Sequence, residues 1–168
     1  MNAVANGTED VLQIFLDILE STRTRYCVVG GLAVNAYVEP VVSLDLDVVI
    51  ETEAVEKVSS KALEQGWKVE SFKLSIILTS SKSELRIQIQ TDPRYQEFLP
   101  RAASKGVLGY PMQVALVEDV LKGKIWAYSD DTRRMSKRQK DLADILRLLE
   151  EYPLLEPMVP SHILNSVT

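Results

Sequence analysis

The sequence predicts an α/β (α+β) protein, in which helices and short strands follow one another along a single chain of 168 residues. Three observations predict this class. Apolar residues recur at helical spacing near the N-terminus, a β-rich run ends at Gly30-Gly31 and leads into a helix, and segment 44–50 alternates as strands do. The length suits one ordinary domain, so we expect a domain over residues 1–150 and a partly irregular C-terminal tail over 151–168.

Clear start and stop signals mark the first elements. Thr8, followed by two acids, predicts the start of a helix whose apolar stripe covers residues 11–19. A short strand is expected over 26–29, and the helix after the glycine pair is expected over 32–38, because Pro40 disfavours its continuation. The predicted unit is therefore a strand, a glycine turn and a helix.

The segment 44–50 (LDLDVVI) is the most informative strand. Successive side chains of a strand point to opposite faces, so Asp45 and Asp47 share one face while apolar residues share the other. Thr52 then opens a helix that Gly66 ends. The sequence thus places two carboxylates on one side of a strand.

The remaining elements have weaker signals. They are strands over 67–73, 74–79 and 84–91, a turn at 80–83 and a helix over 117–128. Asp92-Pro93 interrupts the strand pattern, so we expect irregular or partly helical structure from there to Gly109. Ser136 with Gln139 three residues later predicts the capped start of a last helix, and prolines after it disfavour regular structure at the C-terminus.

Composition excludes several classes of protein. Hydrophobic residues make up 46% of the chain and charged ones 26%, which excludes disordered and collagen-like proteins. The longest uncharged apolar run has about a dozen residues where a bilayer span needs about 20, and no secretion signal opens the chain, so we expect a cytoplasmic protein without a membrane span. With Cys27 and His162 as its single cysteine and histidine, the chain lacks a Cys/His zinc set, and we expect Cys27 to be a small buried hydrophobe.

Charge is unevenly distributed along the chain. The net charge of −5 argues against a general nucleic-acid binder. Between residues 122 and 140, however, seven lysines and arginines stand against two aspartates. This basic stretch is either a solvated helix face or a surface that contacts phosphate or RNA.

The two aspartates point to metal chemistry. Their Cα atoms should lie about 6.6 Å apart, close enough for both side chains to reach one cation. Carboxylate oxygens suit Mg²⁺ or Mn²⁺, which retain water and are completed by substrate phosphates. Side by side and without a cation, the two carboxylates would repel each other. The pattern therefore suggests a site for a metal-bound nucleotide.

At this point the residues resemble a known family. Gly30-Gly31, then Ser43-x-Asp45-x-Asp47, then an alternating strand around Gln88, are similar to the nucleotidyltransferase superfamily related to DNA polymerase β. The resemblance covers about residues 10–150 and is strongest to minimal nucleotidyltransferases and to the nucleotidyltransferase toxins of toxin-antitoxin pairs. It implies a twisted mixed β-sheet flanked by helices.

The resemblance also implies roles for individual residues. Gly30, Gly31 and Ser43 would hold the triphosphate of a nucleoside triphosphate (NTP), and Asp45 and Asp47 would hold Mg²⁺ or Mn²⁺. The implied acceptor is a hydroxyl group on RNA or protein. Toxin-antitoxin proteins of this type further imply a cognate partner protein.

The chain departs from the family at Gln88, where the resemblance implies a third catalytic carboxylate. Glutamine can offer a carbonyl oxygen to a metal but cannot accept a proton as a general base. Three other carboxylates could replace the missing one, but their positions in the sequence do not favour this role: Glu84, Glu70 and Asp92. Apolar residues also stand just before Ser43, where the family often has an arginine.

A second motif lies in the C-terminal half. Lys124 and the pair Asp141 and Asp144 resemble the later part of these proteins, which implies that Lys124 reaches the nucleotide and that one of the aspartates orients it. In the alternative, Lys124 is a solvated lysine and Asp141 pairs with Arg138 or Lys137.

Two functional hypotheses follow. The first is a nucleotidyltransferase that moves a nucleoside monophosphate from an NTP to an acceptor hydroxyl. The second is a catalytically impaired protein of the same fold that binds a nucleotide or a partner protein, as the glutamine at position 88 suggests. Three aromatic residues could stack on a base, although core packing is the favoured role for each: Trp126, Tyr128 and Tyr110.

Overall fold

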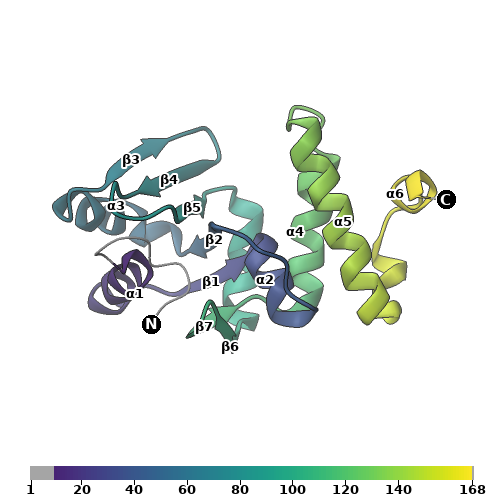
Figure 1. Ribbon diagram of the computed structural model, residues 1–168, viewed down its shortest axis with the longest axis horizontal. Coiled ribbons are helices and arrows are strands. Elements are labelled where there is room, and N and C mark those ends of the chain that lie inside the picture. Colours follow the sequence, from purple (N-terminus) through teal and green to yellow (C-terminus); the bar gives the residue numbers. More distant parts are fainter. Residues whose placement is uncertain (1–9, 168) are drawn as a thin grey trace.

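The computed structural model describes residues 10–167, which form a twisted seven-stranded mixed sheet with helices around it (Figure 1). The helices are α1 (Val11–Ser21), α2 (Gly30–Tyr37), α3 (Val55–Glu64), α4 (Val117–Ser129), α5 (Met135–Glu151) and α6 (Ser161–Leu164). The strands are β1 (Tyr26–Val29), β2 (Asp45–Ile50), β3 (Lys68–Ser71), β4 (Ser75–Thr79), β5 (Arg86–Gln90), β6 (Ala103–Val107) and β7 (Tyr110–Val114). Short 3-10 turns cover Thr52–Ala54, Pro93–Arg101, Pro153–Met158 and Asn165–Val167.

The strand order is β3-β4-β5-β2-β1-β7-β6, which places β2 in the middle of the sheet. β2 runs antiparallel to β1 and parallel to β5. In this register Asp47 lies opposite Val29 on one side and opposite Gln88 on the other. The end of β1, the middle of β2 and the middle of β5 therefore meet at one place.

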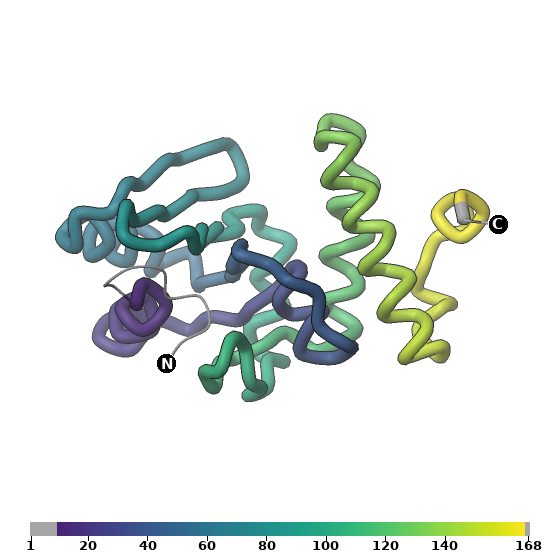
Figure 2. Tube along the Cα trace, viewed as in Figure 1, coloured from purple at the N-terminus to yellow at the C-terminus, as the bar shows by residue number. Residues whose placement is uncertain are grey.

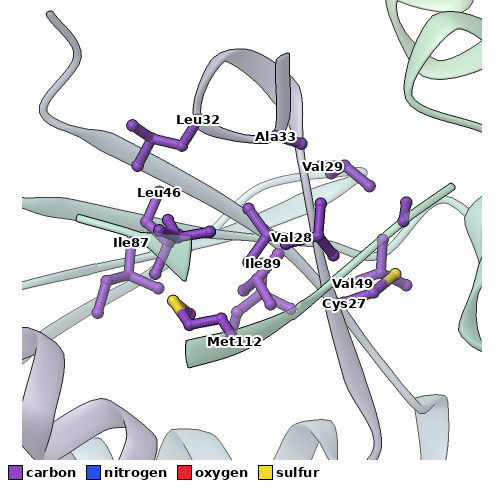
Figure 3. Packing of buried hydrophobic residues seen from close by; sticks show 14 of the residues in the cluster. Cys27, Val28, Val29, Leu32, Ala33, Leu46, Val49, Ile87, Ile89 and Met112 are labelled. Atoms are coloured by element: carbon purple, nitrogen blue, oxygen red, sulfur yellow. The ribbon is translucent and has the colours of Figure 1, made fainter. Parts of the chain in front are cut away.

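One part of the core lies where β1, β2, β5 and β7 pack against α2 (Figure 3), and buried residues of α1, α3, α4 and α5 belong to the same cluster. Leu32 and Ala33 of α2 cover buried side chains such as Val28 and Leu46. Cys27 is fully buried among them, and burial raises the pKa of its thiol to about 12. The prediction of Cys27 as a small buried hydrophobe is confirmed.

α4 and α5 lie side by side at the end of the molecule opposite the β3–β4 hairpin (Figure 1). Between α5 and residue 167, the last that the structure describes, the chain forms two 3-10 helices and the four-residue α6. None of the helices in the described range 10–167 combines the length and the hydropathy needed to cross a membrane.

Three of the predicted helix starts differ from those of the structure. Thr8 lies outside the described residues, and α1 begins at Val11 with Asp10 as its cap, which accepts a hydrogen bond from the Gln13 amide. The capping box at Ser136 and Gln139 is wrong, because α5 begins at Met135 and Ser136 lies within its first turn. The glycine pair is itself helical, as α2 begins at Gly30.

The prediction of irregular structure over 92–109 is wrong in its second half. Residues Pro93–Arg101 form a 3-10 turn, but β6 and β7 follow as a hairpin. Its two-residue loop is Leu108-Gly109, and both residues have positive φ, of 52° and 86°. Such a loop matches the twist of the two strands. The strands themselves were not predicted, because β6 and β7 show little of the apolar alternation that is typical of strands.

Candidate active site

A cavity of about 310 Å³ lies between the sheet and the α4–α5 pair. Seven residues that the sequence predicts for catalysis or for binding of nucleotide and metal line it: Gly30, Gly31, Ser43, Asp45, Asp47, Gln88 and Lys124. We call the side formed by β1, β2, β5 and the start of α2 the sheet wall, and the side formed by α4 and α5 the helical wall.

The sheet wall begins at the turn from β1 into α2. Gly30 has a φ of +72°, and a Cβ atom built there would lie 2.9 Å from the Cβ of Asp47 and overlap the Asp47 carboxylate. Only glycine therefore lets this turn approach Asp47 so closely. Ser43 lies on the other side of the turn, since a Cβ on Gly31 would be 3.9 Å from its Oγ.

The start of α2 offers backbone donors at this wall. No described side chain caps its N-terminus, where Val29 is the N-cap residue. The first N–H groups of a helix have no acceptor within the helix, and they suit a phosphate group. The glycine turn can therefore bind an anion.

Asp45 and Asp47 project from the same face of β2, with Asp45 exposed and Asp47 half-buried. Burial raises the pKa of Asp47 to about 6; the Lys124 charge opposes this shift, and the Asp45 charge adds to it. Two neighbouring carboxylates on one face of a strand fit a divalent cation, because its charge would offset both. Within residues 10–167 no group of three or more His, Cys, Asp or Glu residues could hold a metal. The pair therefore suits a cation that takes its remaining ligands from water and phosphate.

Gln88 stands directly beside Asp47, on the neighbouring strand β5. Gln90 follows on the same face of β5 and also lines the cavity. None of the three candidate replacements for the missing carboxylate lines the cavity: Glu84, Glu70 and Asp92. Asp92 instead accepts hydrogen bonds of 2.8 and 3.1 Å from the Arg94 guanidinium, and this contact lowers the pKa of Asp92.

The helical wall is centred on Lys124, whose exposed fraction is 8%. Its Nζ lies 3.1 Å from Asp141 Oδ1 and 2.9 Å from Asp144 Oδ2. Burial opposes the charge on Lys124, but the two aspartates outweigh that effect and raise the pKa of Lys124. The alternative of a solvated lysine is therefore wrong.

Asp141 also forms an ion pair with a second basic side chain, since Arg133 Nε lies 2.7 Å from its Oδ2. The alternative pairing of Asp141 with Arg138 or Lys137 is wrong. Arg138 instead donates to the carbonyl oxygen of Tyr128. The basic stretch is accordingly divided. Four of its members line the cavity, Lys124, Arg133, Lys137 and Lys140, whereas Lys122, Arg134 and Arg138 do not.

Figure 2 shows the path of the chain between α2 and β2. Two residues that sequence reasoning missed, Arg147 and Asn35, connect this segment to the helical wall. Arg147 lies 2.6 Å from Asp144 Oδ1 and donates to Asn35 Oδ1 and to the Glu39 carbonyl. Asn35 in turn donates to the Val41 carbonyl at 2.6 Å and accepts from the Val41 amide at 3.0 Å. The spacing of Arg147, three residues after Asp144, is the signal that could have indicated the first of these contacts.

The aromatic residues considered for base stacking pack within the protein. Trp126 stacks on Phe98 at a centroid distance of 5.5 Å, with Arg94 over its ring. Tyr128 contacts Arg138, and none of the three candidates lines the cavity. The aromatic side chain that does line it is Tyr95, which the sequence did not single out.

Solved structures with the same arrangement of helices and strands identify the fold. The antibiotic-resistance factor ANT(2″)-Ia, in complex with adenylyl-2″-tobramycin, matches with a TM-score of 0.65 at 13% identity over 94% of this chain and 97% of that one. The chain has the nucleotidyltransferase fold. The lincosamide adenylyltransferase LnuA, with lincomycin bound, shares this fold at a TM-score of 0.57 and 16% identity, over 85% of this chain and 99% of that one.

A third structure with the nucleotidyltransferase fold is a nucleotidyltransferase-like protein from Paracoccidioides brasiliensis. It matches with a TM-score of 0.55 at 16% identity over 83% of this chain and 74% of that one. No family model and no curated protein matches the sequence. The predicted fold, a twisted mixed sheet flanked by helices, is confirmed.

Proposed function

We propose that the chain binds an NTP with Mg²⁺ or Mn²⁺ in this cavity and transfers its nucleoside monophosphate to an acceptor. The observation that carries this proposal is the juxtaposition of Asp45 and Asp47 with the Gly30-Gly31 turn. One element offers oxygen ligands for a cation and the other offers backbone donors for phosphate. The nucleotidyltransferase fold supports the same function.

Each residue would have a distinct role. Asp45 and Asp47 would hold the divalent ion, which when bound would offset negative charge on the phosphates during transfer. Gly30, Gly31 and Ser43 would bind and orient the triphosphate. Lys124 lies close enough to Asp47 for the two charges to interact, and its ion pairs with Asp141 and Asp144 would hold its ammonium group in place.

Gln88 favours a second candidate function. A nucleotidyltransferase that acts on a hydroxyl group needs a base, and the residue beside Asp47 is an amide. The alternative is a cytoplasmic protein that binds nucleotide without turnover and acts through a cognate partner, as in toxin-antitoxin pairs. Under the first candidate the acceptor would be RNA or protein.

Binding is tested by calorimetry with each of the four NTPs, with and without Mg²⁺. We expect metal-dependent binding that Asp45→Asn and Asp47→Asn each abolish. The matched control is Asp17→Asn, which removes an exposed carboxylate on α1, outside the cavity. Metal-dependent binding that persists in both cavity variants would contradict the proposed site.

Turnover is tested with water as the hydroxyl acceptor, by measuring release of nucleoside monophosphate. Gln88→Glu restores a carboxylate beside Asp47, so we expect release to rise by about 100-fold, the lower range of general-base catalysis. Gln90→Glu adds the same charge two residues further along the same face and should not reproduce the rise. Unchanged release in Gln88→Glu, with binding intact, would favour the candidate without turnover.

A further inference from the structure

The sheet wall beyond Asp47 is polar but has no proton acceptor. β5 contributes Gln88 and Gln90 to the cavity, and the β4 residues opposite them are Ile77 and Ser75. None of these four side chains is a base at neutral pH. An acceptor that enters beside Asp47 therefore meets a neutral surface.

The other carboxylates of the cavity are already engaged. Asp141 binds Lys124 and Arg133, and Asp144 binds Lys124 and Arg147, with distances from 2.6 to 3.1 Å. Among the described residues that line the cavity, every carboxylate other than Asp45 and Asp47 is thus ion-paired. Because each of these two carboxylates is already held by two basic side chains, its oxygens are not available to an incoming hydroxyl group.

The helical wall opposite carries uncompensated positive charge. Lys137 and Lys140 lie one turn apart on α5 and both line the cavity. Neither forms an ion pair with a residue in the described range. The charge of Lys137 also reaches the metal-site carboxylate Asp47. This arrangement attracts an anion into the same cavity in which a hydroxyl acceptor would find no base.

We infer that the acceptor is a phosphate monoester, an inference that rests on the nucleotidyl transfer proposed above. The second ionisation of such a group has a pKa of about 6, so at pH 7.5 its oxygen is already an anion. That oxygen attacks the α-phosphorus of the NTP, and the bond from this phosphorus to the bridging oxygen of the β-phosphate breaks. Pyrophosphate leaves with that electron pair, a phosphoanhydride joins the nucleotide to the acceptor, and no proton moves.

Gln88 suits this acceptor better than a carboxylate would. Its amide NH₂ group can donate a hydrogen bond to a phosphate oxygen, and it adds no negative charge beside Asp47. A glutamate there would repel the incoming anion. The presence of Gln88 in place of a carboxylate therefore removes the base that a hydroxyl acceptor would need and at the same time favours the approach of a phosphate.

The test compares two acceptor pairs, with transfer followed from an α-labelled NTP in the presence of Mg²⁺. The pairs are ribose 5-phosphate against ribose, and an RNA oligonucleotide with a 5′-phosphate against the same oligonucleotide with a 5′-hydroxyl. We expect the native chain to transfer to at least one phosphorylated member and to neither unphosphorylated one. The member that reacts distinguishes a small metabolite from an RNA end.

The Gln88→Glu variant should reverse this preference, with transfer to phosphate at least about tenfold lower and transfer to hydroxyl at least about tenfold higher. Gln90→Glu should not reverse it. If the native chain binds Mg²⁺-NTP but transfers only to hydroxyl groups, or to neither kind of acceptor, the inference is overturned while the nucleotide site stands. Absence of Mg²⁺-NTP binding would overturn both.

Equilibrium binding supplies a readout that needs no turnover. Ribose 5-phosphate and the 5′-phosphorylated oligonucleotide are titrated into the protein with Mg²⁺ and a non-hydrolysable NTP analogue. Lys137→Gln with Lys140→Gln should weaken binding of the reactive acceptor about tenfold and reduce its salt dependence. The control pair Lys57→Gln with Lys61→Gln removes the same charge from α3, outside the cavity. Equal effects of the two pairs would contradict the inference.

Discussion

The two walls of the cavity treat charge in opposite ways. On the sheet wall, burial raises the pKa of Asp47 to about 6, and the nearby charge of Asp45 adds to this shift. On the helical wall, Lys124 and its neighbours are joined by ion pairs of 3.1 Å or less. The sheet wall is therefore organised to receive charge from a ligand, whereas the helical wall neutralises the charge of its buried lysine, Lys124.

This difference predicts that substitutions on the sheet wall affect mainly ligand binding and that substitutions on the helical wall affect mainly stability. Groups that are unpaired in the free protein can be removed at little cost to folding, and sites that bind ligands are often of this kind. Removing one member of a buried ion-pair cluster leaves the others unpaired, which is costly. The predictions below compare single substitutions on the two walls.

The largest loss of stability is expected at Lys124. Lys124→Met should reduce the free energy of unfolding by about 3–5 kcal/mol, because Asp141 and Asp144 would keep their negative charge with less compensation. Unfolding in urea measures this change in the free energy of unfolding. Lys140→Met, at an exposed position on the same wall, should cost no more than about 0.5 kcal/mol. A cost below 1 kcal/mol at Lys124 would show that this wall does not depend on its ion pairs.

Gly30→Ala is the substitution on the sheet wall that should affect both folding and binding. The positive φ costs roughly 1–2 kcal/mol, and the overlap with the Asp47 carboxylate adds a cost of about 1 kcal/mol or more. Gly66→Ala isolates the first contribution, because Gly66 has a φ of +82° but no atom near its Cβ position. Equal losses in the two variants would mean that the Gly30 turn does not depend on closeness to Asp47.

Arg147→Gln should have an intermediate effect of about 1–2 kcal/mol, since it removes a charged hydrogen-bonding partner of Asp144 and of Asn35. Hydrogen exchange should accelerate at the Val41 amide, which Asn35 holds. Unfolding in urea and exchange followed by NMR give the two readouts. Exchange that rises equally at the distant Trp67 amide would indicate general destabilisation instead.

The smallest change in stability is expected at Asp47, although its effect on the ligand is large. Asp47→Asn should leave the free energy of unfolding the same or slightly higher, because it removes a charge that burial disfavours. Affinity for Mg²⁺-NTP should nevertheless fall by about 100-fold or more, since even groups that only orient metal ligands contribute 10–100-fold. A marked loss of stability would contradict the contrast between the walls.

The sheet wall could be predicted from the sequence because its signals are local. Alternation along β2 places Asp45 and Asp47 on one face, and the glycine pair marks the turn that meets them. The fold, too, follows from these residues and from their resemblance to nucleotidyltransferases. The β6–β7 hairpin escaped prediction because Pro111 interrupts a strand with little apolar alternation.

The helical wall could be predicted only in part. Lys124, Asp141 and Asp144 carry a resemblance, but their mutual distances depend on how α4 packs against α5. The contacts of Arg147 with Asn35 and Glu39 join residues more than 100 positions apart, and no periodic pattern records them. Long-range polar contacts of this kind need the tertiary structure.

The segment between α2 and β2 owes its path to neighbours and not to its own side chains. Asn35 forms hydrogen bonds with both the N–H and the C=O group of Val41. Val41 and Val42 are 57% and 95% exposed and line the cavity. Positions 41 and 42 can consequently change identity without altering the route of the chain. Substitutions at these two positions, natural or designed, can therefore change which ligands the cavity binds.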